Sequence, residues 1–242
     1  MKVLVACEES QTVCKAFRER GHEAYSCDIQ EPSGGRPEWH ILGDVLNVLN
    51  GGGFNTMDWT AHYVDKWDLI IAHPPCTYLS NAGACRLYPK KNELNYERYS
   101  KGLEGKIFFL HIYYANCDKI CIENPTPSSV YKLPKCSQVI QPYEYGHPFS
   151  KRTCLWLKGL PDLKPTEIIK NYKPYLPSGT SRKIKEQYGA DECEKGGNRH
   201  KKRSKTFEGI AKAMADQWGG GMSNECYRTA DCNRRGSENI RF

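Results

Sequence analysis

Two residues that could do chemistry, Cys76 and Glu123, each follow a short apolar run of the sequence. Residues 68–72 are followed by a short segment in which a Pro-Pro pair directly precedes Cys76. Residues 119–122 are followed directly by Glu123. A thiol attacks as the thiolate, and a nearby cation or helix N-terminus can lower its pKa. A carboxyl group in a partly dry pocket can keep its proton and act as an acid near neutral pH. The two residues therefore predict a nucleophile and an acid that share one pocket.

The elements that must position these residues alternate between short apolar runs and helical stretches. Strands are expected over residues 3–6, 23–27, 68–72, 119–122 and 153–157, with a short mixed segment over 41–49. Helices are expected over 10–20, 103–116 and 207–218, the first of them capped by Ser10 or Glu9. This alternation predicts an α/β fold with a Rossmann-like, doubly wound, mostly parallel sheet. Ligands of such sheets bind at the carboxyl ends of the strands, where Cys76 and Glu123 stand.

Proline and glycine divide the chain into a core and smaller parts. We expect an α/β core over residues 1–157, a small loop-rich basic insert over 158–203, a helix that returns to the core over 204–218 and a polar tail over 219–242. The returning helix carries apolar residues at helical spacing, including Met214 and Trp218, and this stripe is expected to pack in the core.

The net charge of +7 is concentrated in one segment. Residues 164–205 contain twelve basic and five acidic residues, which accounts for the whole excess. A local excess of positive charge suits a polyanionic partner such as a nucleic acid. A solvated, lysine-rich surface loop would have the same composition, so charge alone leaves both interpretations open.

Several classes of protein are not expected from this composition. No run of about 18 uncharged apolar residues is present, so no membrane span is predicted. The N-terminus turns acidic too early for a signal peptide, and we expect a cytoplasmic protein whose twelve cysteines are thiols. Cys193, His200, Cys226 and Cys232 lack the paired spacing of a zinc site, so no metal is predicted.

The sequence around Cys76 and Glu123 is similar to two motifs of the S-adenosylmethionine-dependent DNA cytosine-5 methyltransferases. Residues 74–83, with the pattern Pro-Pro-Cys-x-x-x-Ser-x-Ala-Gly, resemble the catalytic-cysteine motif of that family. Residues 123–125, Glu-Asn-Pro, resemble its Glu-Asn-Val motif. The resemblance spans roughly residues 1–218 and implies a fold of the class I methyltransferase type. The compact form is similar to the small methylases encoded by phages and prophages.

Further residues receive roles from the same resemblance. Asp28 resembles the acid that binds the cofactor ribose, Asp44 the aspartate at the adenine ring, and Arg152 the arginine placed on the target base. Residues 204–211 resemble the last motif, which returns the chain to the cofactor. The implied S-adenosylmethionine-binding residues are Cys7, Glu8, Glu9, Ser10, Asp28, Ile29, Asp44 and Pro74. The implied catalytic residues are Cys76, Glu123 and Arg152, and the implied DNA-binding residues are Pro75, Ser80, Asn124, Lys151, Arg203 and Lys205.

The reaction that the resemblance implies is methyl transfer to C5 of cytosine. The Cys76 thiolate would add to C6 while Glu123 hydrogen-bonds or protonates N3, so that C5 can take the methyl group from the cofactor sulfonium. Loss of the C5 proton then expels Cys76. Because C6 is hidden inside a duplex, the cytosine must be flipped out or already single-stranded. Arg152 is expected at the base oxygen or at an adjacent phosphate.

The loop after the first strand departs from the family pattern. The family has an aromatic residue and several glycines there, whereas this chain has no glycine before Gly21. Glu8 or Glu9 could instead contact the amino group or the sulfonium of the cofactor. The recognition segment is also short, about 45 residues, which predicts a short or relaxed target site.

Two other functions agree with the same residues. One is a nucleic-acid-binding protein with this fold but without turnover, because of the altered cofactor loop. The other keeps the chemistry of Cys76 and Glu123 but applies it to RNA or to a free pyrimidine nucleotide. Binding of S-adenosylmethionine tests the first alternative, and the choice of methyl acceptor tests the second.

Overall fold

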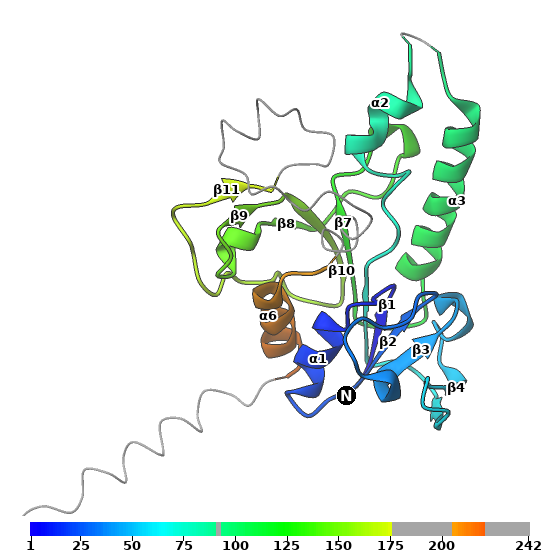
Figure 1. Ribbon diagram of the computed structural model, residues 1–242, viewed down its shortest axis with the longest axis vertical. Coiled ribbons are helices and arrows are strands. Elements are labelled where there is room, and N and C mark those ends of the chain that lie inside the picture. The colour runs from blue at the N-terminus through cyan, green and yellow to red at the C-terminus, as the bar shows by residue number, and fades with distance from the viewer. Residues whose placement is uncertain (91–92, 176–204, 221–242) are drawn as a thin grey trace, which may run out of the picture.

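The computed structural model describes residues 1–90, 93–175 and 205–220, and its centre is a seven-stranded sheet (Figure 1). The strands lie in the order β3-β2-β1-β6-β7-β10-β8. Their bounds are β1 (Lys2–Ala6), β2 (Glu23–Asp28), β3 (His40–Leu42), β6 (Leu69–Ala72), β7 (Ile120–Pro125), β8 (Gln138–Ile140) and β10 (Thr153–Lys158). β10 runs antiparallel to both of its neighbours, and the other pairs are parallel. The predicted Rossmann-like, mostly parallel α/β sheet is thus confirmed.

Helices cover both faces of this sheet. α1 (Thr12–Arg18) and α6 (Glu208–Trp218) lie on one face, and α3 (Tyr96–Tyr113) lies on the other (Figure 1). Successive side chains of a strand point to opposite faces, so each face has its own apolar cluster. In β1, Val3 and Val5 pack with α1 and α6, whereas Leu4 and Ala6 belong to the cluster under α3. The predicted core stripe of the last helix is confirmed, with Met214 and Trp218 buried.

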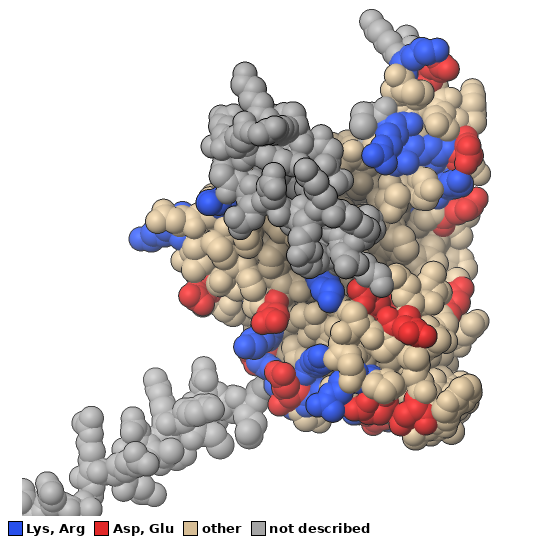
Figure 2. Space-filling view, in the orientation of Figure 1, with Lys and Arg blue, Asp and Glu red and all other residues tan. Residues whose placement is uncertain are grey.

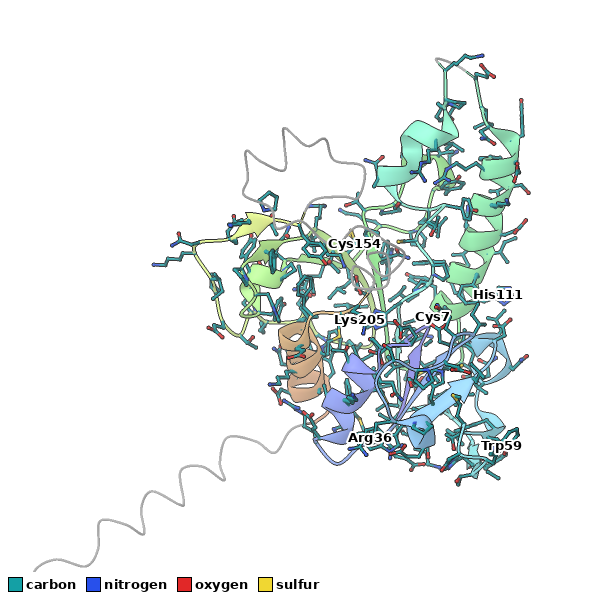
Figure 3. All side chains as sticks on the ribbon, in the orientation of Figure 1. Cys7, Arg36, Trp59, His111, Cys154 and Lys205 are labelled. Atoms are coloured by element: carbon teal, nitrogen blue, oxygen red, sulfur yellow. The ribbon has the colours of Figure 1, made fainter. Side chains whose placement is uncertain are left out.

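Short elements connect and flank the sheet. β4 (Gly52–Asn55) and β5 (Ala61–Val64) form an antiparallel hairpin, and β9 (Phe149–Ser150) pairs in parallel with β11 (Lys173–Pro174). α2 (Ala84–Leu87) precedes α3, and 3-10 turns occur at η1 (Pro37–Trp39), η2 (Val45–Asn47), η3 (Asn81–Gly83), η4 (Ser129–Tyr131) and η5 (Pro142–Glu144). Trp59 projects from the hairpin between β4 and β5, away from Cys7 at the end of β1 (Figure 3).

Two helix boundaries differ from the prediction. α1 begins at Thr12, because Gln11 has a left-handed backbone conformation (φ 58°) that a helix cannot include. α3 begins at Tyr96, before the predicted residue 103, because the Asn95 side chain accepts a hydrogen bond from the backbone N–H of Arg98 at 3.0 Å. The exposed first turns of α3 lack the apolar periodicity by which sequence patterns mark a helix.

Part of the predicted basic insert packs on the core. Leu163 is fully buried, and the backbone N–H of Lys164 donates to Gln217 Oε1 of α6 at 2.8 Å. The rest of the insert, with Arg203 and His200, lies outside the described residues, as do Cys193, Cys226, Cys232 and the tail beyond residue 220. Over the described part of the face in Figure 2, cationic and anionic side chains are interspersed.

Among the residues that the structure describes, no helix combines the length and the apolar character that crossing a bilayer requires.

Candidate active site

The carboxyl ends of β6 and β7 bring His73 and Glu123 together. These parallel strands are neighbours, and Ala72 is paired with Ile122, so the next residue of each strand lies side by side. His73 Nδ1 lies 2.9 Å from Glu123 Oε2, and the two side chains are only 10% and 12% exposed. The resulting buried pair was not predicted from the sequence, because His73 received no role.

The loop that carries Cys76 is bonded to the segment after Glu123. Cys76 itself is half-buried, and its carbonyl accepts the backbone N–H of Ser80 at 2.9 Å, which closes the loop. Ser80 also forms a β-bridge with Pro127. Three hydrogen bonds join the two segments: Asn124 Nδ2 to Pro74 O at 3.2 Å, Asn81 N to Thr126 O at 2.9 Å and Ser128 N to Leu79 O at 2.7 Å. The thiol loop and the carboxylate segment are therefore held as one unit.

Arg98 of α3 supports the thiol loop from outside. Its Nη2 donates to the Thr77 carbonyl at 2.7 Å, and its guanidinium lies 4.9 Å from the centre of the Tyr78 ring. A Cβ on Gly83 would lie 2.5 Å from Arg98 Nη2 and 3.2 Å from the Thr77 carbonyl oxygen, so a larger residue there would displace the Arg98 guanidinium. The motif residue Gly83 thus lies against a cation of α3.

The electrostatics of the pair differ from the sequence expectation. Burial and the Glu123 charge raise the pKa of the Cys76 thiol, and Lys151 opposes them. Burial favours the neutral form of Glu123, but the hydrogen bond from His73 and the charge of Lys151 outweigh it and lower the pKa of Glu123. The charge of Glu123 therefore acts against the thiolate form of Cys76, and the bond from His73 favours the ionised form of Glu123.

Two neighbouring cations occupy different positions. Lys151 acts electrostatically on Cys76, Glu123 and His73, and its Nζ lies 5.8 Å from the centre of the Phe207 ring. Arg152 is exposed, and its Nε donates to Thr126 Oγ1 at 3.1 Å. The structure thus brings Lys151 to the predicted nucleophile and acid, whereas Arg152 lies at the rim beside the segment that follows Glu123.

The glycine-free loop after β1 makes a tight turn with other residues. Cys7 and Gln11 both have φ 58°, a left-handed conformation in which glycine is the usual residue. Gln11 is fully buried and is held by bonds to Ser26 Oγ at 3.2 Å and to both backbone groups of Arg36 at 2.8 and 3.0 Å. Side-chain hydrogen bonds therefore stabilise this left-handed backbone conformation at Gln11, a non-glycine residue.

Glu8 caps α1 from the residues before it. Its carboxylate accepts the backbone N–H groups of Val13 at 2.6 Å and Cys14 at 3.1 Å, and Ser10 Oγ lies 3.5 Å from the same group. Ser10 Oγ also accepts the backbone N–H of Thr12 at 3.4 Å, so the cap expected from Ser10 or Glu9 is made by Ser10 together with Glu8, which was not expected to take part. Both Glu8 oxygens are thus engaged within the protein.

The two carboxylate oxygens of Glu9 differ in their hydrogen bonding. Its Oε2 accepts the backbone N–H of Ser33 at 3.2 Å, whereas Oε1 is buried and has no hydrogen-bond partner among the described residues. Lys205 Nζ donates to Ser33 Oγ at 3.0 Å, so the segment that enters α6 lies against this loop. Figure 3 labels Lys205 and Cys7 in the central part of the view.

Asp28 and Asp44 stand at the ends of β2 and β3 and share the surroundings of Cys7. One carboxylate oxygen of each closes a turn, Asp28 with the backbone N–H of Gln30 and Asp44 with that of Leu46, both at 2.9 Å. Burial and the charge of Asp28 raise the pKa of Cys7, with a further contribution from Asp44. Next to Asp28, the Ile29 side chain is 78% exposed. The carboxyl ends of three adjacent strands thus carry two carboxylates and an exposed apolar side chain.

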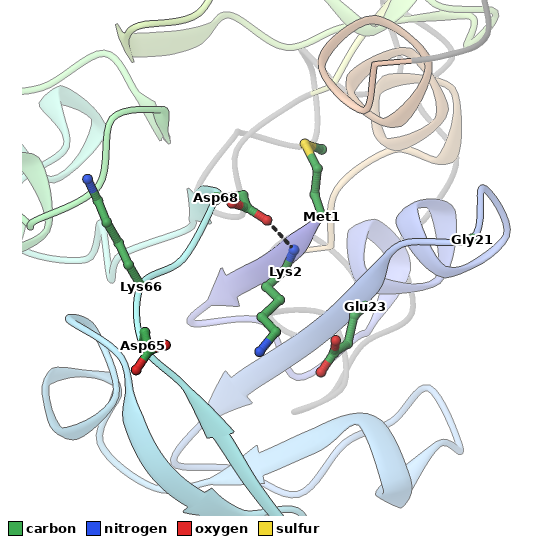
Figure 4. Close-up of a pocket in the computed structure, with 7 residues that line it drawn as sticks. All are labelled: Met1, Lys2, Gly21, Glu23, Asp65, Lys66 and Asp68. Atoms are coloured by element: carbon green, nitrogen blue, oxygen red, sulfur yellow. Dashed lines mark hydrogen bonds between the residues drawn. The ribbon is translucent and has the colours of Figure 1, made fainter.

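A separate pocket opens at the amino ends of the strands, opposite the candidate active site. It is lined by Met1, Lys2, Gly21, Glu23, Asp65, Lys66 and Asp68, and the backbone N–H of Lys2 donates to Asp68 Oδ2 at 2.7 Å (Figure 4). It lies at the amino ends of β1 and β6, so it is separated from Cys76 and Glu123 by the length of the strands.

The fold resembles that of several solved structures. A protein described as a DNA modification methyltransferase encoded within an E. coli prophage is 12% identical, with a TM-score of 0.41 over 70% of this chain and 52% of its own. The Entamoeba histolytica methyltransferase EhMeth is 13% identical, with a TM-score of 0.43 over 70% and 57%. The S. pombe Dnmt2 methyltransferase is 13% identical, with a TM-score of 0.34 over 72% and 51%.

This chain spans about half the length of each of these structures. No protein-family model and no curated protein matches the sequence. The fold class is defined by the strand order and directions of the sheet itself.

Proposed function

We propose that this chain is an S-adenosylmethionine-dependent methyltransferase of the compact phage type that acts on C5 of cytosine in DNA. The observation that carries the proposal is the joining of the Cys76 loop to the segment after Glu123, at the carboxyl ends of adjacent parallel strands. A nucleophile and a carboxylate that can relay a proton, held in one geometry, suit addition to a pyrimidine ring. The resemblance of both sequence motifs to that enzyme family adds to this geometry.

In the proposed reaction, Cys76 loses its proton to solvent and its sulfur bonds to C6 of cytosine. The charge that develops on the ring is neutralised at N3 through Glu123, so that C5 becomes nucleophilic. Bound S-adenosylmethionine supplies an electrophilic methyl group on a sulfonium. C5 takes that group as the bond from the methyl carbon to the sulfonium breaks and leaves a neutral thioether. C5 then gives its proton to solvent, and the bond between C6 and sulfur breaks to release the methylated base and the Cys76 thiolate.

The loop after β1 and the ends of β2 and β3 fit the cofactor. The unpartnered, buried Glu9 Oε1 can accept a hydrogen bond from the ammonium group of the methionine moiety. Asp28 suits ribose hydroxyls and Asp44 the adenine amine, because each carboxylate uses one oxygen in its own turn and keeps the other. The exposed Ile29 side chain offers an apolar surface for the adenine ring. Cys7 and Pro74 would border the same site.

The substrate side of the proposed site is formed by the two joined loops. Pro75 is exposed and Ser80 half-buried next to Cys76, and Lys151 supplies positive charge beside it. Asn124 is buried and holds Pro74, so its contribution to the substrate is to position the loop. We assign Arg152, Lys205 and Arg203 to the phosphate backbone of a flipped or single-stranded target.

The first test is tritium transfer from labelled S-adenosylmethionine to DNA, RNA and dCMP in parallel. The proposal expects label in DNA at C5 of cytosine and none with Cys76→Ala. Cys136→Ala is the matched control, because Cys136 is half-buried and outside the proposed site, and it should keep the activity. If label appeared only in RNA or only in dCMP, the proposed DNA substrate would be wrong and the labelled acceptor would be the substrate.

A second test traps the covalent step. DNA containing 5-fluorocytosine cannot lose its C5 substituent as a proton, so a Cys76-dependent adduct should accumulate with the cofactor present. Calorimetry of S-adenosylmethionine binding separates the remaining alternative. An intact fold that binds nucleic acid but no cofactor would establish a binding protein without turnover and refute the enzyme.

A further inference from the structure

Resting on the proposed function, we propose that His73 is a positioning residue that orients Glu123 and holds the proton which Glu123 passes to the cytosine ring. No sequence motif assigns His73 a role in this chemistry. It is placed by the structure alone, at the carboxyl end of β6 between the loop after β1 and the end of β7.

One hydrogen bond holds the His73 main chain and another holds its imidazole ring. The backbone N–H of His73 donates to the Ala6 carbonyl at 2.9 Å, which ties the residue to the end of β1. On the other side, Nδ1 is 2.9 Å from Glu123 Oε2, and an ionised carboxylate can only accept, so Nδ1 carries the hydrogen. His73 Nε2 is buried and has no partner among the described residues. The ring is thus held by one side-chain bond, and that bond is directed at the proposed acid.

The charged and titratable groups around the pair come from every element that packs against it. Glu8 from the loop after β1 favours the charged form of His73, and Lys151 from the loop before β10 opposes it. Cys76 on the adjoining loop and Cys121 within β7 both face Glu123. Burial lowers the pKa of His73, but the bond to Glu123 and the two carboxylate charges outweigh it and raise that pKa overall.

This arrangement solves a chemical difficulty of the proposed reaction. An ionised Glu123 has no proton to give, and an ordinary glutamate has lost its proton long before neutral pH. The pair of Glu123 and His73 keeps one proton, carried as the imidazolium. As the bond from sulfur to C6 forms, one proton leaves His73 Nδ1, passes through Glu123 and arrives at N3. When the adduct breaks down, N3 returns that proton, and the pair is restored.

A purely structural role is less suited to the observations. The segment after Glu123 is already fastened to the Cys76 loop by Asn124, Asn81 and Ser128. A hydrogen bond that only oriented Glu123 would not need a titratable donor.

The test uses His73→Asn, because the Asn side-chain nitrogen is attached to Cγ as Nδ1 is in histidine. This variant can keep the donor to Glu123 but cannot hold the proton. We expect kcat for methyl transfer to fall roughly 10- to 100-fold at neutral pH, with KM nearly unchanged. The rate of the variant should also begin to fall at a lower pH than that of the wild type. His111→Asn, on the exposed face of α3, is the matched control and should leave the profile unchanged.

A measurement without turnover accompanies the kinetics. Titration of the His73 ring, followed by NMR of the labelled full chain, should give a pKa above that of ordinary histidine in the wild type and a lower one in Glu123→Gln. Wild-type transfer with the same pH profile in His73→Asn, or a His73 pKa no higher than that of an ordinary histidine, would overturn this inference and leave the proposed function intact. Absence of transfer by the wild type to any acceptor would overturn both.

Discussion

Glu8 and Glu123 are both buried glutamates at the carboxyl end of a parallel strand, and both lie near His73, yet their partners differ. Glu8 accepts two backbone N–H groups of α1, which have no proton to exchange on the timescale of catalysis. Glu123 accepts from a histidine ring, which can give its proton up. The pKa of Glu8 is raised, mainly by burial, whereas that of Glu123 is lowered, because its bond to His73 and the charge of Lys151 outweigh burial.

The comparison teaches that burial at the catalytic edge of a sheet does not by itself make a carboxylate reactive. A carboxylate whose lone pairs are taken by fixed backbone donors serves the fold. One whose partner titrates can serve the chemistry. The same residue type therefore has a role in the fold at Glu8 and a proposed role in the chemistry at Glu123.

The largest expected effect is on turnover through Glu123. Glu123→Gln should lower kcat for methyl transfer by roughly 100- to 10,000-fold, because the amide cannot carry a proton to N3. Tritium transfer to DNA measures it. Glu97→Gln, at an exposed glutamate of α3, is the control and should keep full activity. A kcat of Glu123→Gln within threefold of the wild-type value would contradict a chemical role for Glu123 and so the difference from Glu8.

Glu8 should act on stability instead. Glu8→Ala leaves the buried N–H groups of Val13 and Cys14 without their acceptor, and we expect the free energy of unfolding to fall by about 1–3 kcal/mol. Urea-induced unfolding followed by circular dichroism measures this. Glu19→Ala, at an exposed position just after α1, should change stability by less than about 0.5 kcal/mol. Equal effects of the two substitutions would contradict the capping role.

The two glutamates should also respond to pH with opposite sign. The pKa of Glu8 is raised in the folded state, so its contribution to stability is present below the unfolded pKa and is lost as pH rises through the folded pKa. The pKa of Glu123 is lowered, so its contribution is present above the unfolded pKa and is lost as pH falls through the folded pKa. Unfolding free energies measured from acid to neutral pH should therefore rise for Glu8→Gln relative to wild type and fall for Glu123→Gln. Parallel curves would disprove this.

The smallest expected effect concerns the two cations. Lys151 opposes the rise in the pKa of Cys76, so Lys151→Met should raise that pKa further and slow alkylation of Cys76 by iodoacetamide by a few-fold at neutral pH. Arg152→Met should not change the alkylation rate, because Arg152 is exposed and bonded to Thr126. Mass spectrometry of the Cys76 peptide over time follows both variants. If only Arg152→Met slowed the reaction, the assignment of the two cations would be reversed.

Much of the fold follows from pattern. The apolar runs at residues 3–6, 68–72 and 119–122 predicted central strands, because strands covered on both faces must be apolar throughout. β8 and the β4–β5 hairpin were not predicted. β8 is only three residues long, and the hairpin begins at glycines whose pattern indicates a loop.

The candidate site was predictable only where a motif marked it. Cys76 and Glu123 stand out by their flanking residues, whereas His73 does not, although its place directly before Pro74, opposite Glu123 in a parallel pair, was a usable signal. Glu8 was expected to contact the cofactor, and its bonds to the first turn of α1 were not predicted. The donor to which a side-chain oxygen bonds depends on tertiary contacts. A sequence pattern does not specify those contacts.

The bonds that join the Cys76 loop to the segment after Glu123 matter for anyone who would redesign this protein. Main-chain groups make most of these bonds, so they tolerate changes of side chain but not of loop length. Replacing one segment with a new specificity loop would also change the conformation of the other segment. The two segments are one interchangeable part, and they should be transplanted, shortened or diversified together.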